Sequence, residues 1–238
     1  MNIIHFDTLP STNTEAKDAR YVGGDVIVAD SQTLGRGQRG HTWSSRAGEN
    51  LTASFVVIPS QLSVDCQFLL SQTAALAVVD TLRGYGIESR VKWTNDIYCG
   101  DKKICGILIE NTLSGNKVSR SIIGIGVNIN QCDFDPDLPN PTSMRLQDGC
   151  QRNVGEVLTA LCDAVEQRLA MAAAEPERLS ADYNSLLYRR GENYRYRLPE
   201  GGYLDGEICS VGSDGRLVLD TEAGRRSFAF KEIEFIIG

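Results

Sequence analysis

Residues 31–44 read SQTLGRGQRGHTWS, a run in which three glycines alternate with two arginines and a glutamine before a tryptophan. Glycine lets backbone N–H groups approach an anion closely and tolerates positive φ. The planar fork of an arginine matches a carboxylate or a phosphate. The run therefore predicts a loop that closes over a small anionic ligand. A solvated turn has a similar composition, so other motifs must decide between the two.

The same loop also contains the letters of the dinucleotide-binding fingerprint, G-x-G-x-x-G, which needs a strand before it and a helix after it. Residues 25–30 (DVIVAD) supply the strand, but residues 50–58 (NLTASFVVI) predict a second strand where the helix should begin. No P-loop Gly-Lys-Ser/Thr follows, and neither H-R-D nor D-F-G of a protein kinase appears downstream. The loop is therefore predicted to bind an anion in another way.

The composition is that of an ordinary globular protein with a substantial core. Of the 238 residues, 42% are hydrophobic and 23% charged, and the formal net charge of −7 with no long Lys/Arg run disfavours general nucleic-acid binding. The N-terminus does not read as a signal peptide, and no 18-residue apolar segment predicts a membrane span. The seven cysteines are scattered without a C-x-x-C pair, which indicates a reducing cytoplasm. With only His5 and His41, a His-based triad or His-rich metal site is almost excluded.

The hydrophobic patterns predict an α+β chain that ends in a small β domain. Strands are expected at residues 2–6, 25–30, 50–58, 88–93, 103–110 and 119–130, and helices at 12–21, 63–84, 154–174 and 176–188. Residues 131–149 read as a proline-bearing loop, and Thr12 with Glu15 fits a capping box. Short strands at 194–198, 202–211, 216–220 and 225–230, separated by Gly/Asp turns, predict a small barrel. The expected domains are residues 1–189 and 190–238.

A second group of polar residues surrounds a predicted hairpin turn at Gly100-Asp101. Asn95 and Asp96 follow a strand, where sheet proteins place ligand groups, and Lys103 and Gly106 lie on the return strand. In the next strand Gly124 and Gly126 permit close backbone approach, and Asn128 stands at its end. Ser11 and Thr12 are either helix-start residues only or hydroxyl donors to a polar ligand.

Taken in order, these motifs resemble those of biotin–protein ligases. Residues 35–43 resemble the family's G-R-G-R-x-G-R-x-W loop, residues 92–96 its K-W-P-N-D, and residues 103–110 its K-x-x-G-I-L-x-E. Residues 11–13 (STN) and 124–128 (GIGVN) also match in the family's order. The resemblance covers almost the whole chain. It implies a mixed-sheet catalytic domain of the biotin–lipoate ligase type, similar to class II aminoacyl-tRNA synthetases, followed by a small SH3-like β-barrel.

The resemblance also implies an activity. In this family the carboxylate of biotin attacks the α-phosphate of ATP with Mg²⁺, which gives biotinyl-5′-AMP and pyrophosphate. A lysine amine on the biotin carboxyl carrier domain of a carboxylase, such as acetyl-CoA carboxylase, then takes the biotinyl group. Arg36 and Lys103 are the catalytic cations that the resemblance implies, because two mutually repelling anions must be held together. Asp96 is the expected Mg²⁺ ligand.

The remaining site residues are also carried over from the family motifs. The residues expected to bind biotin are Ser11, Thr12, Asn13, Gln32, Gly35, Arg36, Gly37, Gln38, Lys103 and Gly106. The residues expected to bind ATP are Arg36, Arg39, His41, Trp43, Asn95, Ile107 and Asn128.

Three positions depart from the family pattern. Gln38 and His41 stand where arginines are common, and Thr94 replaces the usual proline. Unless Arg39 or Lys102 compensates, the loss of charge at Gln38 predicts weaker loop closure and easier escape of biotinyl-AMP. Some family members carry an N-terminal DNA-binding domain; here the catalytic motifs begin near Met1, so no specific DNA binding is expected. A homodimer is left open.

Two alternatives compete with this assignment. A lipoate–protein ligase of the same fold is the nearest, but Gln32 with Ser11 and Thr12 suits the ureido ring of biotin. A non-catalytic biotin sensor is the other, although simple binding has no need of Arg36, Lys103 and Asp96 around a triphosphate.

Overall fold

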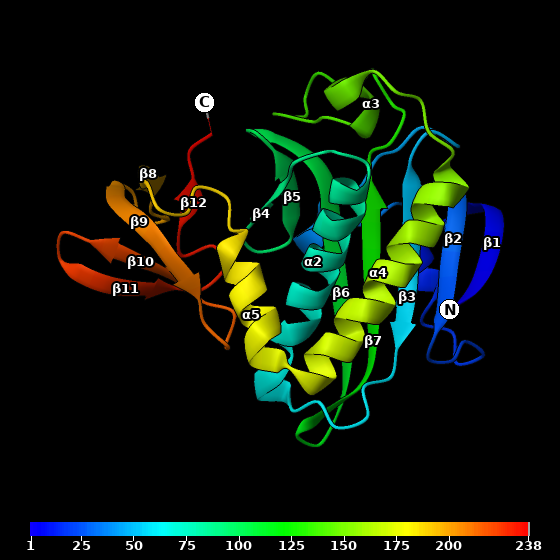
Figure 1. The fold of residues 1–238 in the computed structure, drawn as a ribbon, viewed down its shortest axis with the longest axis horizontal. Coiled ribbons are helices and arrows are strands. Elements are labelled where there is room, and N and C mark those ends of the chain that lie inside the picture. Colours follow the sequence, from blue (N-terminus) through cyan, green and yellow to red (C-terminus); the bar gives the residue numbers. More distant parts are fainter. Residues whose placement is uncertain (238) are drawn as a thin grey trace.

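A seven-stranded mixed sheet is the centre of the fold in the computed structural model (Figure 1). The structure describes residues 1–237, without the side chain of Arg39. The strand order of the sheet is β1-β2-β3-β7-β6-β5-β4, with β1 and β2 parallel and the other neighbours antiparallel. The strands are β1 (Asn2–Leu9), β2 (Asp25–Gln32), β3 (Leu51–Val57), β4 (Arg90–Lys92), β5 (Asp96–Cys99), β6 (Lys102–Ser114) and β7 (Lys117–Val127). The predicted mixed sheet and α+β class are confirmed.

Three helices cover one face of this sheet, as Figure 1 shows. They are α2 (Phe68–Gly84), preceded by the 3-10 turn η2 (Val64–Cys66), α4 (Val154–Ala174) and α5 (Pro176–Ser185). Helix α2 is apolar on nearly every side because it lies between the sheet and the other two helices. Helix α4 begins where the side-chain oxygen of Asn153 accepts from the backbone N–H of Gly155 at 2.8 Å, and α5 begins with Pro176 at its first turn.

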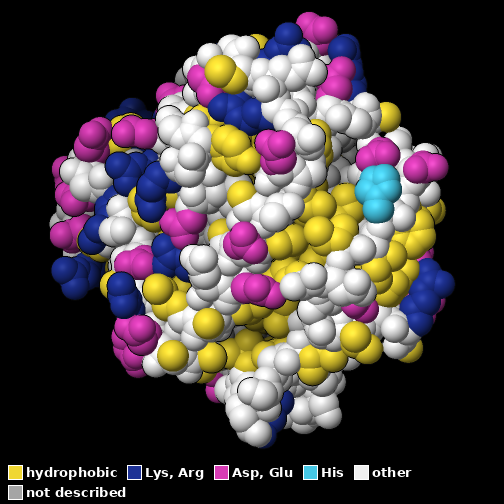
Figure 2. Space-filling model, turned by 45° about the vertical axis from the view of Figure 1, so that its right-hand side comes forward, with side chains coloured by type: hydrophobic (Ala, Val, Ile, Leu, Met, Phe, Trp, Pro, Cys, Tyr) yellow, Lys and Arg dark blue, Asp and Glu magenta, His cyan; other side chains and the backbone are white. Residues whose placement is uncertain are grey.

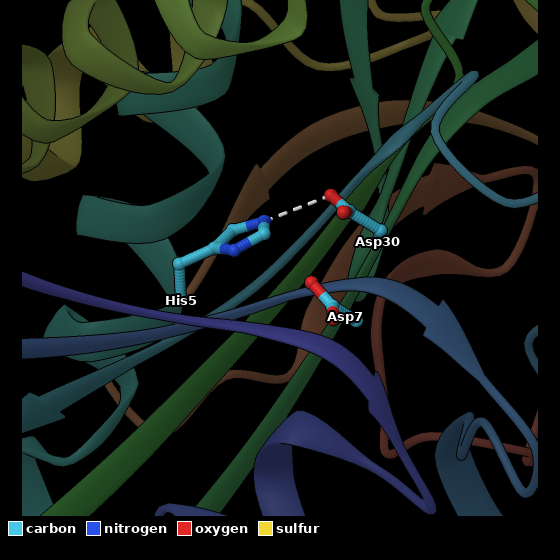
Figure 3. A group of neighbouring side chains, drawn as sticks. All are labelled: His5, Asp7 and Asp30. Atoms are coloured by element: carbon cyan, nitrogen blue, oxygen red, sulfur yellow. Dashed lines mark hydrogen bonds and ion pairs between the residues drawn. The ribbon is translucent and has the colours of Figure 1, made fainter.

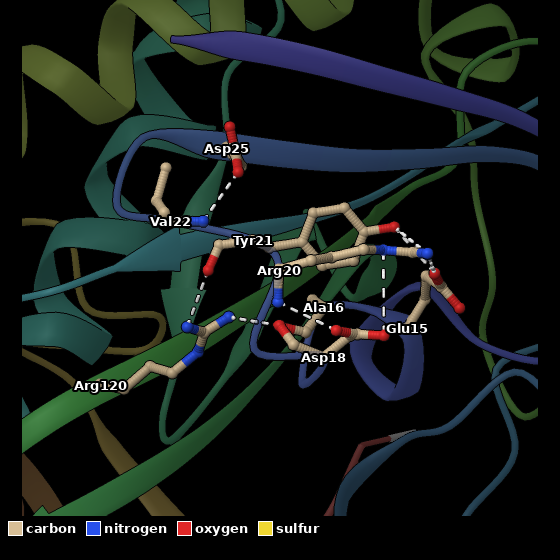
Figure 4. Close-up of polar contacts among 8 residues, drawn as sticks. All are labelled: Glu15, Ala16, Asp18, Arg20, Tyr21, Val22, Asp25 and Arg120. Carbon is tan, nitrogen blue, oxygen red and sulfur yellow. Dashed lines mark hydrogen bonds and ion pairs between the residues drawn. The ribbon is translucent and has the colours of Figure 1, made fainter.

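The opposite face of the sheet carries a short helix, α1 (Thr12–Glu15). The predicted helix over 12–21 is wrong beyond Glu15. The predicted capping box of Thr12 and Glu15 does not form, because the Thr12 hydroxyl contacts Gln32 and Ser54 and the Glu15 carboxylate accepts from the hydroxyl of Tyr21. Arg120 of β7 donates to the backbone carbonyls of Ala16 and Tyr21, both at 2.9 Å, and of Asp18 at 3.2 Å (Figure 4). The carbonyls of residues 16–21 therefore bind a guanidinium from β7, and this segment turns back toward β2.

We expect Arg120→Met to lower the free energy of unfolding by about 2 kcal/mol, because hydrogen bonds from a charged donor contribute roughly 1.5–3 kcal/mol. Urea denaturation is the measurement. Lys117→Met is the control: this exposed lysine lies on the same strand and donates to the side chain of Gln61, so its effect should stay within about 0.5 kcal/mol. Equal unfolding midpoints for the two variants would show that Arg120 does not hold the segment.

The last part of the chain forms a separate five-stranded antiparallel sheet in the order β11-β10-β9-β8-β12. Its strands are β8 (Asn193–Arg197), β9 (Tyr203–Val211), β10 (Leu217–Thr221), β11 (Gly224–Phe228) and β12 (Glu234–Phe235). The predicted short strands are present, with β12 added. Closure into a barrel is not confirmed, because in the described residues the sheet is open, with β11 and β12 at its two edges. The expected boundary at 189/190 lies in the connection between α5 and β8 and stays a prediction.

Aromatic rings fix the second sheet to the first. The indole N–H of Trp93, next to β4, donates to the carbonyl of Gly215 at 2.9 Å. The ring of Phe235 on β12 lies 6.4 Å from that of Tyr188, and the ring of Tyr188 lies 5.4 Å from that of Tyr98 on β5. The second sheet is therefore held against the end of the large sheet where β4 and β5 lie.

The segment predicted as a loop at 131–149 contains a helix, α3 (Met144–Asp148). The hydroxyl of Ser143 caps it by accepting from the N–H of Leu146 at 3.2 Å. The loop before it pairs with the start of β6: Lys103 N–H donates to the carbonyl of Asn140 at 2.7 Å, and Thr142 N–H to that of Lys103 at 2.9 Å. The loop thus lies against Lys103.

The surface on the side of β1 and β2 mixes charges of both signs around a central apolar area and shows no extended basic field (Figure 2). Among the described residues, the helices are too short or too polar to span a membrane.

Candidate active site

A cavity of about 890 Å³ opens on the sheet face that the long helices leave free. In β7, Ile123, Ile125 and Val127 belong to the core that includes α2, so the alternating positions Gly124 and Gly126 face the other way. The cavity is bounded by α1, the glycine loop, β6, β7, the Asn140 loop and the second sheet. It brings together segments from both ends of the chain.

The glycine loop is a small hairpin that folds back on itself. Trp43 N–H donates to the carbonyl of Gly35 at 3.0 Å, and Gly37 N–H to that of His41 at 2.7 Å. A Cβ atom on Gly35 would lie 2.2 Å from the carbonyl oxygen of Trp43, so only glycine allows this turn. The tip is the 3-10 turn η1 (Gln38–Gly40), and β3 follows, so the absence of a dinucleotide-binding helix is confirmed.

Trp43 lies flat against a floor of glycine backbone. A Cβ atom on Gly126 would lie 2.4 Å from its Cε2 atom, and one on Gly106 would lie 3.0 Å from its Cζ3 atom. The indole Nε1 is buried and has no hydrogen-bond partner among the described residues. The ring thus forms part of the cavity wall, with its Nε1 turned toward the backbone of Gly126.

A polar network forms the end of the cavity near α1. The side-chain oxygen of Gln32 accepts from the N–H of Thr12 at 2.7 Å and from its hydroxyl at 3.2 Å. The buried hydroxyl of Ser54 lies 2.8 Å from that of Thr12 and 2.6 Å from the amide oxygen of Asn13. A Cβ atom on Gly124 would collide with that amide at 2.0 Å. Ser54 was not predicted, because it reads as one more residue of an apolar strand.

Glu110 forms ion pairs with two cations, Arg36 and Lys17, at the end of the cavity near α1. Both of its carboxylate oxygens accept from the guanidinium of Arg36 at 3.0 Å, while Lys17 donates at 2.8 Å and the amide of Asn13 at 3.1 Å. Burial alone would raise the pKa of Glu110, but the hydrogen bonds from Lys17, Asn13 and Arg36 outweigh it and lower the pKa. A pair this exposed adds only about 0.2–1 kcal/mol to stability; its main effect is to order the loop.

The other cations lie near β4 and β5. The ammonium of Lys103 is 2.6 Å from Oδ1 of Asp96. The side-chain amide of Asn95 donates to the backbone carbonyl of Ile107 at 2.8 Å, and the backbone N–H of Ile107 donates to the backbone carbonyl of Asn95 at 2.9 Å. Lys92 also lines the cavity, over the rings of Tyr98 and Phe235, and burial lowers its pKa. The peptide bond between Trp93 and Thr94 is cis.

Most residues predicted for the site lie on the wall of this one cavity. They are Ser11, Thr12, Asn13, Gln32, Arg36, Gly37, Gln38, His41, Trp43, Asn95, Asp96, Lys103, Gly106 and Ile107. Gly35 lies behind the wall, where it shapes the loop. Asn128 is buried outside the wall and donates its amide to the carbonyl of Thr142 at 2.8 Å. The side chain of Arg39 is outside the described residues.

Sequence reasoning missed the contribution of the second sheet. Arg197, Leu198, Lys231 and Glu234 line the cavity from β8, β12 and their connections. No local signal marks them, because they reach the cavity only once distant contacts, such as those of Trp93 and of Asn184 with Val211, place the second sheet.

Groups that could hold a metal ion are few. Among the described residues, the cluster of three or more such side chains is His5, Asp7 and Asp30, with His5 Nε2 at 2.8 Å from Asp30 (Figure 3). It is exposed on β1 and β2, away from the cavity wall. Within the cavity Asp96 stands next to a cation rather than in a cage of carboxylates. It therefore suits only an ion that takes most of its ligands from phosphates and water, as Mg²⁺ does.

The fold and the cavity define an α+β protein in which a glycine loop and several cations line one large pocket. Residues 5–128 match the model of the biotin/lipoate A/B protein ligase family. The chain belongs to this family.

Two relatives align with nearly all of this chain. The biotin–[acetyl-CoA-carboxylase] ligase of Paracoccus denitrificans is 34% identical over 94% of this chain and 97% of its own. The bifunctional ligase/repressor BirA of Bacillus spizizenii is 30% identical over 98% of this chain and 74% of its own. Among solved structures, the biotin protein ligase from Aquifex aeolicus in complex with biotin and ATP superposes with a TM-score of 0.85 at 26% identity, covering 100% of this chain and 99% of that one.

We expect Gly126→Ala to push Trp43 off the glycine floor, because overpacking of this kind costs about 1–3 kcal/mol unless a side chain moves. Quenching of tryptophan fluorescence by acrylamide should increase, since the second tryptophan, Trp93, is buried. Gly84→Ala is the matched control, as a Cβ there meets nothing within 4 Å. Unchanged quenching in Gly126→Ala would contradict the packing described for Trp43.

Proposed function

We propose that this protein is an ATP-dependent biotin–protein ligase. It activates biotin as biotinyl-5′-AMP, releases pyrophosphate, and transfers biotin to a lysine of a biotin carboxyl carrier domain. The observation that carries the proposal is a single cavity that places the polar network of Thr12, Asn13 and Gln32 at one end and the Trp43 ring with Lys103 further along. The names of the full-length relatives support it.

In the first step the site must bring two anions into contact. The carboxylate of biotin attacks the α-phosphorus of ATP, a new O–P bond forms, and the bond to pyrophosphate breaks. Lys103 offsets the repulsion between the anions, and Arg36 covers them from the loop. Catalysis here consists mainly of positioning and charge stabilisation. The ion pair with Asp96 holds the ammonium of Lys103 at the cavity wall before substrates arrive.

The ends of the cavity suit the two substrates. The hydroxyl and amide groups of Ser11, Thr12 and Gln32 match a ureido ring, which both donates and accepts hydrogen bonds. Trp43 offers a stacking face to adenine, with Asn95 at the nearby wall. Asn128 contributes to this end through the Thr142 loop that it supports.

Magnesium is part of the proposal. Asp96 would hold it together with phosphate oxygens and water, and the ion would neutralise charge on the triphosphate. In the second step the amine of the carrier lysine attacks the acyl carbon of the adenylate, an amide bond forms, and AMP leaves. The glycine loop has to keep water away from the adenylate until then.

The wider setting follows from the same proposal. The described cysteines are all free, which fits a reducing cytoplasm. We also propose that the second sheet belongs to an SH3-like module, which would form a domain from residue 190 onward.

One assay tests the function. Purified protein, ATP, Mg²⁺ and labelled biotin are mixed with an apo carrier domain, and label on the carrier lysine is measured. Exchange of pyrophosphate into ATP is run in parallel with biotin and with lipoate. Biotin-dependent exchange with carrier labelling supports the ligase; lipoate-dependent exchange would support the lipoate enzyme, and binding of biotin without either would support a sensor.

Lys103→Ala should reduce biotin-dependent pyrophosphate exchange by roughly 100-fold or more, the usual cost of losing one stabilising donor in a site of this kind. Lys102→Ala removes the neighbouring exposed lysine and should leave exchange near the parental rate. Near-ultraviolet circular dichroism checks that both variants fold. A folded Lys103→Ala variant with full exchange would remove Lys103 from the mechanism.

Gln38→Arg should slow the release of biotinyl-AMP by roughly tenfold, because it adds a charge-assisted hydrogen bond to the closing loop. A pulse-chase measurement of adenylate release gives the rate. Gln38→Met serves as the control, with similar size and no charge. If the three proteins release the adenylate equally fast, position 38 does not govern retention.

A further inference from the structure

Glu110 ends the K-x-x-G-I-L-x-E run, and the function proposed above gives it no role. Its side chain is nevertheless held by three segments at once: Arg36 of the glycine loop, Asn13 of α1, and Lys17 just after α1. Arg36 reaches it with two parallel hydrogen bonds of 3.0 Å each. The two-point contact fixes the orientation of the guanidinium as well as its position.

The place of Glu110 on β6 explains how it can join these segments. Gly106 and Leu108 line the cavity, and Glu110 is the next residue that points to the same face. Leu108 pairs with Gly124 in the sheet, and Asn13 lies on Gly124. Asn13 donates its amide both to the carbonyl of Leu108 at 3.3 Å and to Glu110 at 3.1 Å. Glu110 thus stands where the floor of the cavity meets both α1 and the loop.

We infer that Glu110 is a positioning residue, a latch that holds the glycine loop through Arg36 and couples it to α1 through Asn13. The part of the inference that concerns ligand retention rests on the proposed function. Without Glu110, Arg36 would be a long exposed side chain with many conformations and no counter-ion. With Glu110 present, Arg36 of the loop and Asn13 of the proposed biotin end of the cavity both donate to the same carboxylate.

The latch does not have to open for Arg36 to act. A guanidinium has five N–H donors, and the contact with Glu110 uses two of them. The remaining donors can bind a substrate anion while the contact persists. The carboxylate of Glu110 lies outside the cavity wall, so its charge is shielded from the substrate by the arginine that it holds.

The test uses Glu110→Gln, which keeps the shape but replaces one acceptor oxygen by an NH₂ group that cannot accept from Arg36. Lys17→Met is the matched control: it also removes a partner of Glu110 but leaves Arg36 and Asn13 in place. The first readout is tryptic cleavage after Arg36 in the ligand-free, full-length protein, with cleavage after the exposed Arg225 as internal reference. The second is the rate of biotinyl-AMP release.

We expect Glu110→Gln to speed cleavage after Arg36 and adenylate release by roughly fivefold each, because local opening of the loop becomes easier. Lys17→Met should change neither by more than about twofold, in keeping with the small effect of an exposed ion pair. Parental rates for Glu110→Gln in both assays, or equal effects in both variants, would overturn the latch. If the parent protein makes no adenylate, the proposed function fails, while cleavage after Arg36 still decides whether Glu110 holds the loop.

Discussion

The close contact of Trp43 with the glycine backbone of β6 and β7 is the constraint on which the site depends. An indole ring can lie this close to the backbone of a sheet only where the residues beneath it have no side chain. Gly106 of β6 and Gly126 of β7 meet this requirement, and they are paired directly in the sheet register. The contact fixes the end of the glycine loop, and Gly35 fixes its start by pairing with Trp43 itself. Because both ends of the loop are fixed, the residues between them lie along the cavity.

The same use of absent side chains recurs at the other end. Gly124 leaves room for the amide of Asn13, which α1 could not otherwise bring down to the sheet. One face of β7 is thus bare where the substrates are proposed to lie, while its other face, with Ile123 and Ile125, belongs to the core that includes α2. A strand that packs a core on one side and presents backbone on the other serves folding and binding together.

Two of the cations that line the cavity are paired with carboxylates before any ligand arrives. Arg36 is held by Glu110 and Lys103 by Asp96, and each pair contributes little to stability because it is partly exposed. Their main effect is to order the cations, because a side chain that is already held in one conformation loses less conformational entropy when it binds a substrate anion. Lys92 differs from these two, since burial lowers its pKa and its ammonium lies over the rings of Tyr98 and Phe235.

The sequence by itself determined the parts of the protein that depend on local pattern. The glycine spacing of the loop, the apolar strands around it, and the extent of α4 follow from residues close in the chain, where glycine conformation and hydrophobic period act directly. What only the tertiary structure decided involves distant partners. The segment that follows α1 departs from the predicted helix, and its carbonyls accept from Arg120, about a hundred residues later. Residues of the second sheet reach the cavity because contacts such as those of Trp93 and Phe235 hold that sheet against the first. Such contacts leave no local signal, because the partner that fixes each segment lies elsewhere in the chain.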